Sequence, residues 1–257
     1  MSFLYEARGI VLSRRDRKEA DRCYFVFTKE HGKIEFIARG GHKILAKLTP
    51  HLESVAEVDL LIVNGRAYDT VAGVERHRAF PNIYQDWSRL LLARNALFLV
   101  DIGTRTHQHD PILYDELVHF LDFIDESPSL SAERSSFVLG AFAVKLLSLI
   151  GYHPEMYRCL VCKKNIASVR YLWHALKGGV VCQDCAKHNQ EDWFAARPLQ
   201  DETLKLLRFA LTEPFSEQLR PELPGQVLSE FHDTVESLII SHFPTIPPNS
   251  LRGACLV

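Results

Sequence analysis

Four cysteines in two C-x-x-C pairs constrain this 257-residue chain more than any other feature of its sequence. Cys159 and Cys162 form the first pair, and Cys182 and Cys185 form the second, with nineteen residues between the pairs. This spacing lies within the range of four-cysteine zinc sites, in which each short turn presents two thiolates to one tetrahedral ion. The pattern therefore predicts a metal site with four sulphur ligands.

The residues between the pairs predict a β-hairpin that brings the pairs together. Residues 169–173, with the sequence V-R-Y-L-W, suit a first strand. Residues 177–179 have the composition of a turn, and Val180-Val181 suits the returning strand. Metal binding supplies on the order of 10 kcal/mol of folding free energy to a segment too small for its own core. We predict one structural Zn2+ in an insert that spans residues 153–195.

Three other uses of these residues compete with a structural zinc site. A thioredoxin-type redox motif would place one C-x-x-C at the start of a helix after a parallel strand, and neither pair has that setting. Catalytic zinc would keep three protein ligands and an open position, which four available cysteines disfavour. His174 or His188 could replace a cysteine, although lone histidines in such loops are more often solvated.

The first eighty residues have the composition and periodicity of five short β-strands. We expect turns at His31-Gly32 and at Asn64-Gly65, and the second dipeptide suits a two-residue type I′ hairpin. Five strands in about eighty residues favour a small barrel, and the five-stranded OB-fold is the nucleic-acid-binding barrel of this size. The segments rich in Val, Ile, Phe and Tyr are 6–13, 22–28, 33–38, 55–63 and 66–75.

After residue 80 the apolar residues recur at helical spacing. Ser131 can cap one of these helices, and Gly151 fits its C-terminal end. The helices are expected at residues 86–105, 114–125, 132–149, 200–212 and 225–243.

The sequence thus predicts an α+β multidomain protein with a five-stranded OB-fold barrel, an all-α domain and a zinc-ribbon-like insert. We place the barrel, as a candidate nucleic-acid-binding domain, at residues 1–80. The first part of the helical domain follows at 81–152, and the four-cysteine insert occupies 153–195. The second part of the helical domain, with the C-terminal tail, covers 196–257.

Basic residues are concentrated near the N-terminus. Residues 1–50 hold 11 Lys and Arg against 6 Asp and Glu, whereas the remaining residues hold 19 against 26. A charged segment at 13–22 is expected as a loop after the first strand, and a second basic segment follows the third strand. If the second segment is a short helix, Arg39, Lys43 and Lys47 share one face and can contact phosphates without base readout. A solvated surface is an equally good interpretation of the composition.

The sequence indicates no signal peptide and no apolar run long enough to span a bilayer. We expect a cytoplasmic location without a membrane partner, where paired cysteines favour a metal over a disulfide. No phosphate loop and no motif of metalloproteases, α/β-hydrolases or dinucleotide enzymes is present. Glu19 and Asp21 could suggest a metal-dependent nuclease, but acids beside five basic residues more often form local ion pairs. We therefore expect no enzymatic activity.

Four short motifs occur in a defined order in the predicted barrel. They are A-x-G-I-V-L at 7–12, E-A-D at 19–21, F-x-x-E-H-G-K at 27–33 and A-R-G-G-H-K at 38–43. Together with the helices and the four-cysteine insert, they make the chain resemble the bacterial RecO recombination mediators over nearly its whole length.

The resemblance implies a mediator of DNA repair and homologous recombination. Proteins of this family bind single- and double-stranded DNA, anneal complementary strands and, with RecR, help load RecA onto single-stranded DNA coated by its binding protein, SSB. Some members lack the metal cysteines, which favours a structural role for them here. The DNA-binding residues implied for this chain are Arg39, Lys43 and Lys47 and, as a second group, Arg14, Arg15 and Arg17.

Partner binding is expected in the helical domain. The acidic C-terminal tail of SSB needs a cationic rim around an apolar pocket, and the helical cations that could form it are Arg89, Arg94, Arg105 and Lys145.

Two questions stay open at the level of the sequence. Tyr24 or Tyr68 could stack on bases, although an aromatic on a strand face is more often part of a core. The alternative function is a zinc-ribbon adaptor or transcription-associated protein that acts through protein contacts. Charge reversal at Arg39, Lys43 and Lys47 would leave the activity of such an adaptor intact.

Overall fold

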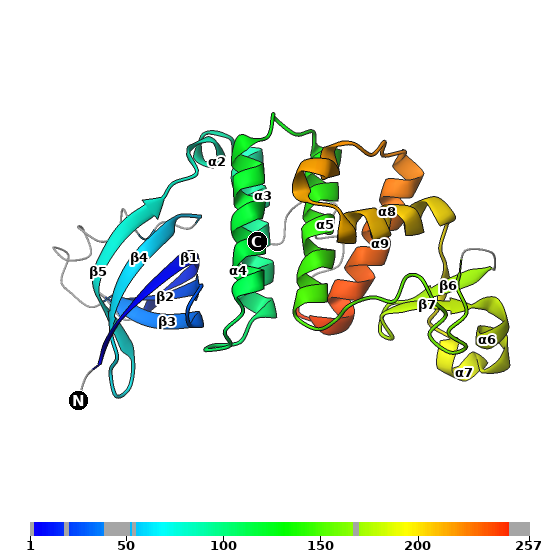
Figure 1. The fold of residues 1–257 in the computed structure, drawn as a ribbon, viewed down its shortest axis with the longest axis horizontal. Helices are drawn as coiled ribbons and strands as arrows, with labels where there is room; N and C mark the ends of the chain where they lie inside the picture. Colours follow the sequence, from blue (N-terminus) through cyan, green and yellow to red (C-terminus); the bar gives the residue numbers. More distant parts are fainter. Residues whose placement is uncertain (1–2, 18–20, 39–51, 53–54, 167–169, 247–257) are drawn as a thin grey trace. The chain divides into compact units, whose positions relative to one another are not determined.

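The computed structural model describes residues 3–17, 21–38, 52, 55–166 and 170–246 of the chain (Figure 1). Contacts between Cα atoms divide the chain into two compact units, residues 1–130 and 131–256. The first unit holds the strands β1 to β5 and the helices α2 to α4, so these helices lie in the same unit as the barrel. The second unit holds the remaining helices and all four clustered cysteines.

Five strands form a closed barrel in the order β1-β2-β3-β5-β4, which confirms the predicted OB-like fold. The β3–β5 pair is parallel, and the other four pairs are antiparallel. The strands are β1 (Leu4–Arg17), β2 (Asp21–Thr28), β3 (Gly32–Ala38), β4 (Glu57–Val63) and β5 (Asp69–Arg78).

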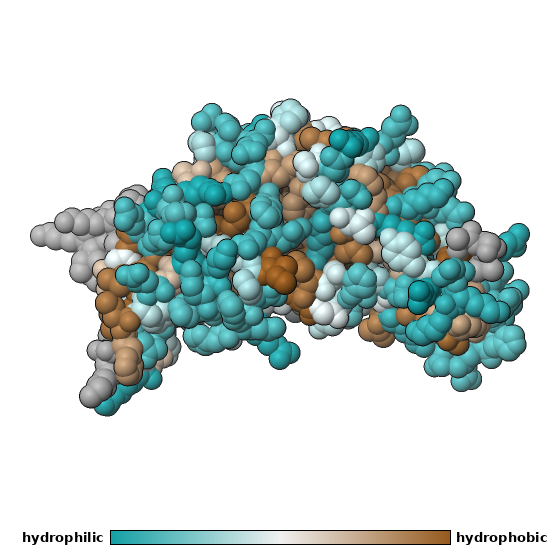
Figure 2. Space-filling view, in the orientation of Figure 1, coloured by the Kyte–Doolittle hydropathy of each residue, from teal (hydrophilic) through white to brown (hydrophobic). Residues whose placement is uncertain are grey.

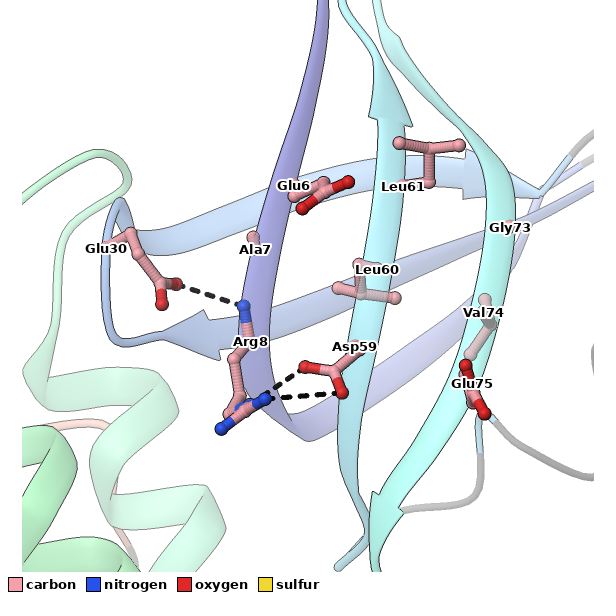
Figure 3. A pocket seen from close by; sticks show the side chains of 10 residues that line it. All are labelled: Glu6, Ala7, Arg8, Glu30, Asp59, Leu60, Leu61, Gly73, Val74 and Glu75. Carbon is pink, nitrogen blue, oxygen red and sulfur yellow. Dashed lines mark hydrogen bonds and ion pairs between the residues drawn. The ribbon is translucent and has the colours of Figure 1, made fainter.

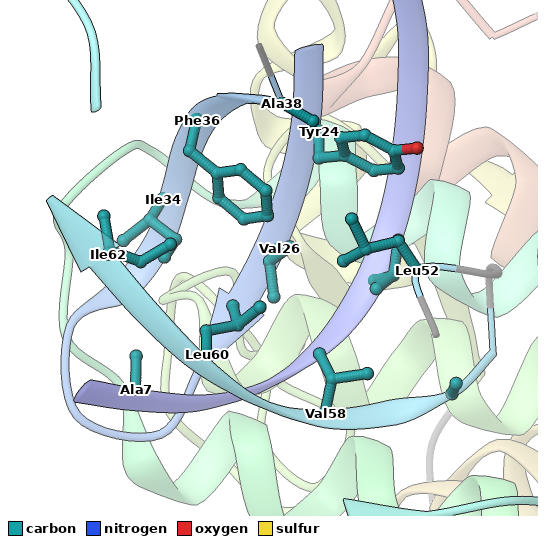
Figure 4. Close-up of a cluster of buried hydrophobic side chains, with 12 residues drawn as sticks. Ala7, Tyr24, Val26, Ile34, Phe36, Ala38, Leu52, Val58, Leu60 and Ile62 are labelled. Carbon is teal, nitrogen blue, oxygen red and sulfur yellow. The ribbon is translucent and has the colours of Figure 1, made fainter. Parts of the chain in front are cut away.

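The inward-facing side chains of the strands fill the barrel (Figure 4). Tyr24 is fully buried there, and its ring stacks on Phe36 with 5.7 Å between the ring centroids. Tyr24 is therefore a core residue. On the other face of β2, Phe27 is also buried, and its ring lies 6.2 Å from that of Tyr114. This part of β2 is covered on both faces because α4 packs against the barrel.

Strand β1 continues through the arginines for which the sequence predicted a loop. Arg14, Arg15 and Arg17 pair with residues of β2 in a regular antiparallel register. The loop prediction was wrong. Charged residues give no apolar alternation from which a strand could be predicted, and this part of β1 is stabilised by backbone hydrogen bonds to β2. A register shift between Val11 and Ser13 leaves Leu12 as an extra residue, so β1 contains a bulge.

The two predicted turns have different outcomes. Gly32 has a φ of +66°, and the Thr28 hydroxyl donates to its carbonyl oxygen at 2.8 Å, so a turn forms at His31-Gly32. The two-residue hairpin at Asn64-Gly65 is wrong, because β4 ends at Val63 and β5 begins only at Asp69. The Asp69 carboxylate instead organises a longer loop by accepting from Asn64 Nδ2 at 3.0 Å.

Three helices complete the first unit: α2 (Pro81–Gln85), α3 (Trp87–Gly103) and α4 (Pro111–Glu126). Asp86 separates α2 from α3, and its carboxylate caps α3 by accepting from the backbone N–H groups of Ser88 and Arg89. Polar contacts join these helices to the barrel. The Tyr114 hydroxyl donates to buried Glu57 at 2.7 Å, and the Ser13 hydroxyl donates to Asp101 at 2.9 Å.

The second unit is built on α5 (Ala132–Leu149), α8 (Asp201–Thr212), the 3-10 helix η1 (Phe215–Leu219) and α9 (Gly225–His242). The bounds predicted for α5 are confirmed, because Ser131 caps it and Gly151 follows it with a φ of +100°. Helices α5 and α9 pack closely: a Cβ on Gly140 would lie 2.6 Å from the Phe231 ring.

The insert between α5 and α8 contains the predicted hairpin. Strand β6 (Tyr171–His174) pairs with β7 (Gly179–Cys182) and with the short β8 (Arg197–Pro198). Helices α6 (Gln183–His188) and α7 (Gln190–Trp193) follow β7. No helix within the described ranges is long and apolar enough to cross a membrane.

Candidate metal centre and nucleic-acid interface

The four cysteine sulphurs converge on one point of the insert. Their Sγ atoms all lie within 4.8 Å of one another, and those of Cys162 and Cys182 are 3.9 Å apart. A tetrahedral zinc ion with bonds of about 2.3 Å separates its sulphur ligands by roughly 3.8 Å. The residues present therefore fit one tetrahedral ion with sulphur ligands.

Backbone hydrogen bonds hold the two cysteine pairs in place. Leu160 donates its N–H to the Val180 carbonyl at 2.9 Å, which ties the first C-x-x-C turn to the hairpin. Cys182 ends β7 and precedes α6, so Cys185 lies in the first turn of that helix. The N–H of Cys182 also donates to the Cys159 sulphur at 3.3 Å. The hairpin thus fixes one pair against the other.

The thiols of the cluster differ in their pKa values. Burial alone would raise the pKa of the Cys159 thiol, but N–H groups of Cys182, Cys162 and Val161 lower its pKa to about 6. Burial raises the pKa of Cys182, while a hydrogen bond with Cys182, followed by burial, raises the pKa of Cys185 to about 12. Because a metal ion binds the thiolate form of cysteine, metal binding at this cluster would release the protons of the remaining thiols.

Neither nearby histidine belongs to the cluster. His174 is buried and accepts a hydrogen bond from the Lys177 backbone at 3.2 Å, while its ring packs edge-on against Trp193. Burial lowers the pKa of His174. The ring of His188 lies 2.7 Å from the Asp184 carbonyl oxygen. The four cysteines are the ligand set that the structure offers.

The second candidate site is the basic end of β1. The Arg17 guanidinium carbon lies 3.9 Å above the centroid of the Tyr68 ring, and that of Arg15 lies 5.0 Å from Phe25. Tyr68 is 43% exposed. Because Arg17 belongs to the β1–β2 hairpin and Tyr68 to the β4–β5 loop, their contact joins the two loops with which OB-folds bind oligonucleotides.

The bulge at Leu12 decides which arginines reach this face. Val11 points into the barrel, so strict alternation would also point Ser13, Arg15 and Arg17 inward. The bulge reverses the phase, and Ser13 instead pairs with the outward-facing Phe25. We call Arg15, Arg17, Phe25 and Tyr68 the barrel face. Arg14 lies on the opposite side of the strand.

Near the barrel face, Lys33 and Asp16 are paired with groups of opposite charge, whereas Glu35 is an exposed carboxylate that accepts from a thiol. Lys33 forms an ion pair with Asp101 and is mostly buried. Glu35 accepts from the Cys23 thiol at 3.0 Å, and burial together with this bond raises the pKa of Cys23 to about 12. Asp16 pairs with Arg22 at 3.0 Å. Among the residues that the structure describes, Arg14, Arg15 and Arg17 have no carboxylate within ion-pair distance.

The outer face of β1, β4 and β5 has the opposite character. Glu6, Glu30, Asp59 and Glu75 line a hollow there, together with Arg8 (Figure 3). Arg8 donates to Asp59 at 2.8 Å, and this bond holds the pKa of Asp59 below its usual range. The hollow therefore presents mainly acidic side chains, which repel phosphates.

The remaining predicted residues are distributed differently. Arg39, Lys43 and Lys47 lie outside the residues that the structure describes. Arg89 is structural, because its guanidinium donates to the carbonyl oxygens of Asp125 at 2.7 Å and Ser127 at 2.6 Å. The Lys145 ammonium lies 5.3 Å from the Phe215 ring. Arg94 and Arg105 are exposed.

Sequence reasoning missed Phe25 as a member of the barrel face. Its half-burial between Arg15 and Lys33 depends on the β1 bulge and on the pairing of β1 with β2. The sequence offered one signal, the alternation that places Phe25 opposite to Tyr24 on β2.

Hydrophilic residues predominate over the visible surface, and apolar patches interrupt them (Figure 2).

A closed OB-like barrel with one basic face, joined in one chain to a helical unit with a four-thiol cluster, defines a class of multidomain nucleic-acid-binding proteins. Family models identify the member of that class. The model for the N terminal of recombination protein O matches residues 1–80, and the model for its C terminal matches residues 84–252. The chain belongs to the RecO family.

Curated relatives agree with this assignment. A DNA repair protein RecO of Desulfitobacterium hafniense is 28% identical over 183 residues, which are 71% of this chain and 64% of that protein. The chain thus spans just under two thirds of that relative. The RecO protein of Dehalococcoides mccartyi is 26% identical over 235 residues, 91% of this chain and 89% of the relative. The RecO protein of Caldanaerobacter subterraneus is 26% identical over 94% of both chains.

Proposed function

We propose that this protein is a non-catalytic mediator of DNA repair and homologous recombination. It binds single- and double-stranded DNA, anneals complementary strands and, with RecR, helps load RecA onto SSB-coated single-stranded DNA. Membership of the RecO family and relatives named DNA repair protein RecO support the general role. The partners RecR, SSB and RecA follow from what the family resemblance implies.

The contact between Arg17 and Tyr68 is the observation that carries the DNA-binding part of the proposal. A guanidinium that rests on an aromatic ring at 3.9 Å and forms a hydrogen bond with the same tyrosine is held in place, and its remaining N–H groups can contact a phosphate. Tyr68 is 43% exposed, and the ring face that Arg17 does not cover offers a base a surface for stacking. The acidic outer surface of β4 and β5 leaves the opposite side as the DNA path.

Annealing requires no covalent chemistry from this protein. Arginines that neutralise phosphates lower the repulsion between two strands, and base pairing then supplies the driving force. Stacking on Tyr68 and Phe25 would keep bases of a bound strand separated and available. The barrel face therefore acts as a platform that holds one strand for its complement.

The cofactor in this proposal is one structural Zn2+ bound by Cys159, Cys162, Cys182 and Cys185. The four-sulphur donor set and the mutual distances of the sulphurs support it. When bound, zinc would supply folding free energy to the insert. The backbone of the hairpin orients the thiolates, and no ligand position remains open for substrate.

Annealing of complementary oligonucleotides coated with SSB tests the proposal. We expect the wild type to accelerate annealing and Arg15→Glu/Arg17→Glu to lose most of the acceleration, because two phosphate contacts become repulsive. The matched control is Lys205→Glu/Arg220→Glu, which makes the same change of charge on exposed residues of the second unit. Arg39→Glu/Lys43→Glu/Lys47→Glu tests the other predicted group.

Two outcomes would contradict the proposal. If the wild type does not accelerate annealing at low salt, the annealing function is wrong, and an adaptor that works through protein contacts becomes the better explanation. Mg2+-dependent cleavage of a labelled duplex by the purified protein, absent from a preparation of Arg15→Glu/Arg17→Glu, would show an enzyme instead of a mediator.

A further inference from the structure

A second basic and aromatic surface lies beside β1, next to the barrel face. Asp101 in its lining pairs with Lys33, whose ammonium lies 5.7 Å from the Phe25 ring. Here β1, Leu52, α2 and α3 line a partly enclosed hollow of about 590 Å3. Its floor is apolar, with Leu52 and Phe98, and its polar lining includes Arg14 and Arg94. Both arginines are exposed.

Large exposed aromatics continue this surface along α3. Tyr84 lines the hollow and is 43% exposed, and Trp87 is 71% exposed. Trp87 and Arg94 are seven residues apart, so they lie on the same face of α3, about 10 Å apart along its axis. We call Arg14, Tyr84, Trp87 and Arg94 the α3 groove.

The acids near the α3 groove have partners of their own. Asp101 forms an ion pair with Lys33 and accepts from the Ser13 hydroxyl. Asp86 caps α3 and lies 3.7 Å from the Arg89 guanidinium. The two arginines of the groove therefore face a surface on which the nearest carboxylates are already compensated.

We propose that the α3 groove binds a second segment of single-stranded DNA. Arg14 and Arg94 contact its phosphates, and Tyr84 and Trp87 stack on its bases. This inference rests on the proposed DNA-binding function and extends it, because it assigns a second strand to a surface next to the barrel face. Arg15 and Arg17 serve the barrel face, and Arg14 serves the α3 groove.

Charge and shape favour DNA over a peptide as the occupant. Cations that alternate with exposed aromatic rings are the general pattern of single-strand binding surfaces. The surface is also extended, from Arg14 on β1 to Trp87 at the start of α3, which suits a polymer with repeated phosphates. An acidic peptide needs only the hollow and would leave Trp87 unused.

The tryptophans of this chain provide a direct probe. Of its three tryptophans, Trp173 and Trp193 are 5% and 8% exposed, so Trp87 is the accessible one. Fluorescently labelled oligo(dT) is titrated with the full-length protein at low salt while anisotropy reports binding. Tryptophan emission is followed in a parallel titration with unlabelled oligo(dT), and we expect quenching over the concentration range in which the oligonucleotide binds.

Variants distinguish loss of the fluorescence signal from loss of DNA binding. Trp87→Phe keeps an aromatic ring, so it should bind oligo(dT) within about twofold of the wild type but lose the quenching. Trp87→Ala and Arg94→Glu should each weaken binding roughly fivefold or more, and Arg94→Glu should reduce the salt slope by about one. Ile112→Ala, at another exposed apolar residue, and Lys205→Glu are the matched controls and should change binding less than twofold.

Each contrary outcome is specific. Binding of oligo(dT) without quenching in the wild type overturns the α3 groove and leaves the proposed function standing. No binding of oligo(dT) at all overturns both. Quenching by a peptide of four Asp residues and a C-terminal Phe, with none by oligo(dT), makes the groove a docking site for an acidic peptide instead. Equal losses in Arg94→Glu and Lys205→Glu would show a general charge effect and no groove.

Discussion

Two glycines with the same backbone conformation differ in what surrounds them. Gly32 has a φ of +66° and Gly178 a φ of +65°, values at which any L side chain is strained. A Cβ on Gly32 would lie 2.0 Å from the Gln108 carbonyl oxygen, whereas a Cβ on Gly178 would meet nothing within 4 Å. The sequence predicts both turns, but only the packing of the α3–α4 connection against the barrel distinguishes the two positions.

We therefore expect Gly32→Ala to destabilise the protein more than Gly178→Ala. Gly178→Ala should lower the free energy of unfolding by about 1 kcal/mol, since only backbone strain is added. Gly32→Ala adds a steric clash with backbone and should lower it by roughly 3 kcal/mol or more. Urea unfolding followed by circular dichroism measures both. Equal losses would mean that the Gln108 backbone moves aside without difficulty.

Helix α5 and strand β1 show which elements could be predicted from the sequence. Ser131 and Gly151 are local signals, so the bounds of α5 follow from the residues at its ends. The end of β1 and its bulge depend on pairing with β2, which no local pattern of residues 13–17 records. The same limit applies to the sites: cysteine spacing predicts the metal cluster, whereas the contact of Arg17 with Tyr68 requires the closed barrel.

The hairpin of β6 and β7 should depend on the metal. Cys162→Ser/Cys185→Ser removes two of the four sulphurs, so we expect zinc content to fall from about one ion per chain to near zero. The insert should then lose its fold, because its small core cannot replace the metal-binding free energy. Metal analysis and the rate of proteolysis within residues 153–195 test this. Ser148→Ala, outside the insert, is the control and should keep its zinc. Full protease resistance in the metal-free variant would show that the hairpin folds unaided.

At the scale of the whole molecule, the proposed DNA-binding surfaces and the proposed metal site lie in different compact units. The barrel face and the α3 groove belong to residues 1–130, and the four cysteines belong to residues 131–256. The helices α2 to α4 share polar contacts with the barrel, among them the bond from Tyr114 to Glu57. We therefore expect the fold of the unit that holds the barrel to have no requirement for the metal. This separation follows from three-dimensional contacts, since helical periodicity alone does not tell which core a helix joins.

Loss of the metal should consequently leave single-strand binding intact. We expect Cys162→Ser/Cys185→Ser to bind oligo(dT) within about twofold of the wild type, and Arg15→Glu/Arg17→Glu to bind at least tenfold more weakly while keeping one zinc per chain. Two reversed phosphate contacts also predict a shallower dependence of affinity on salt, with a slope smaller by about two. Anisotropy titrations at several salt concentrations, paired with metal analysis of the same preparations, measure both properties. A tenfold loss of DNA affinity in the metal-free variant would contradict the separation, because it would mean that the insert either contacts DNA or supports the fold of the barrel.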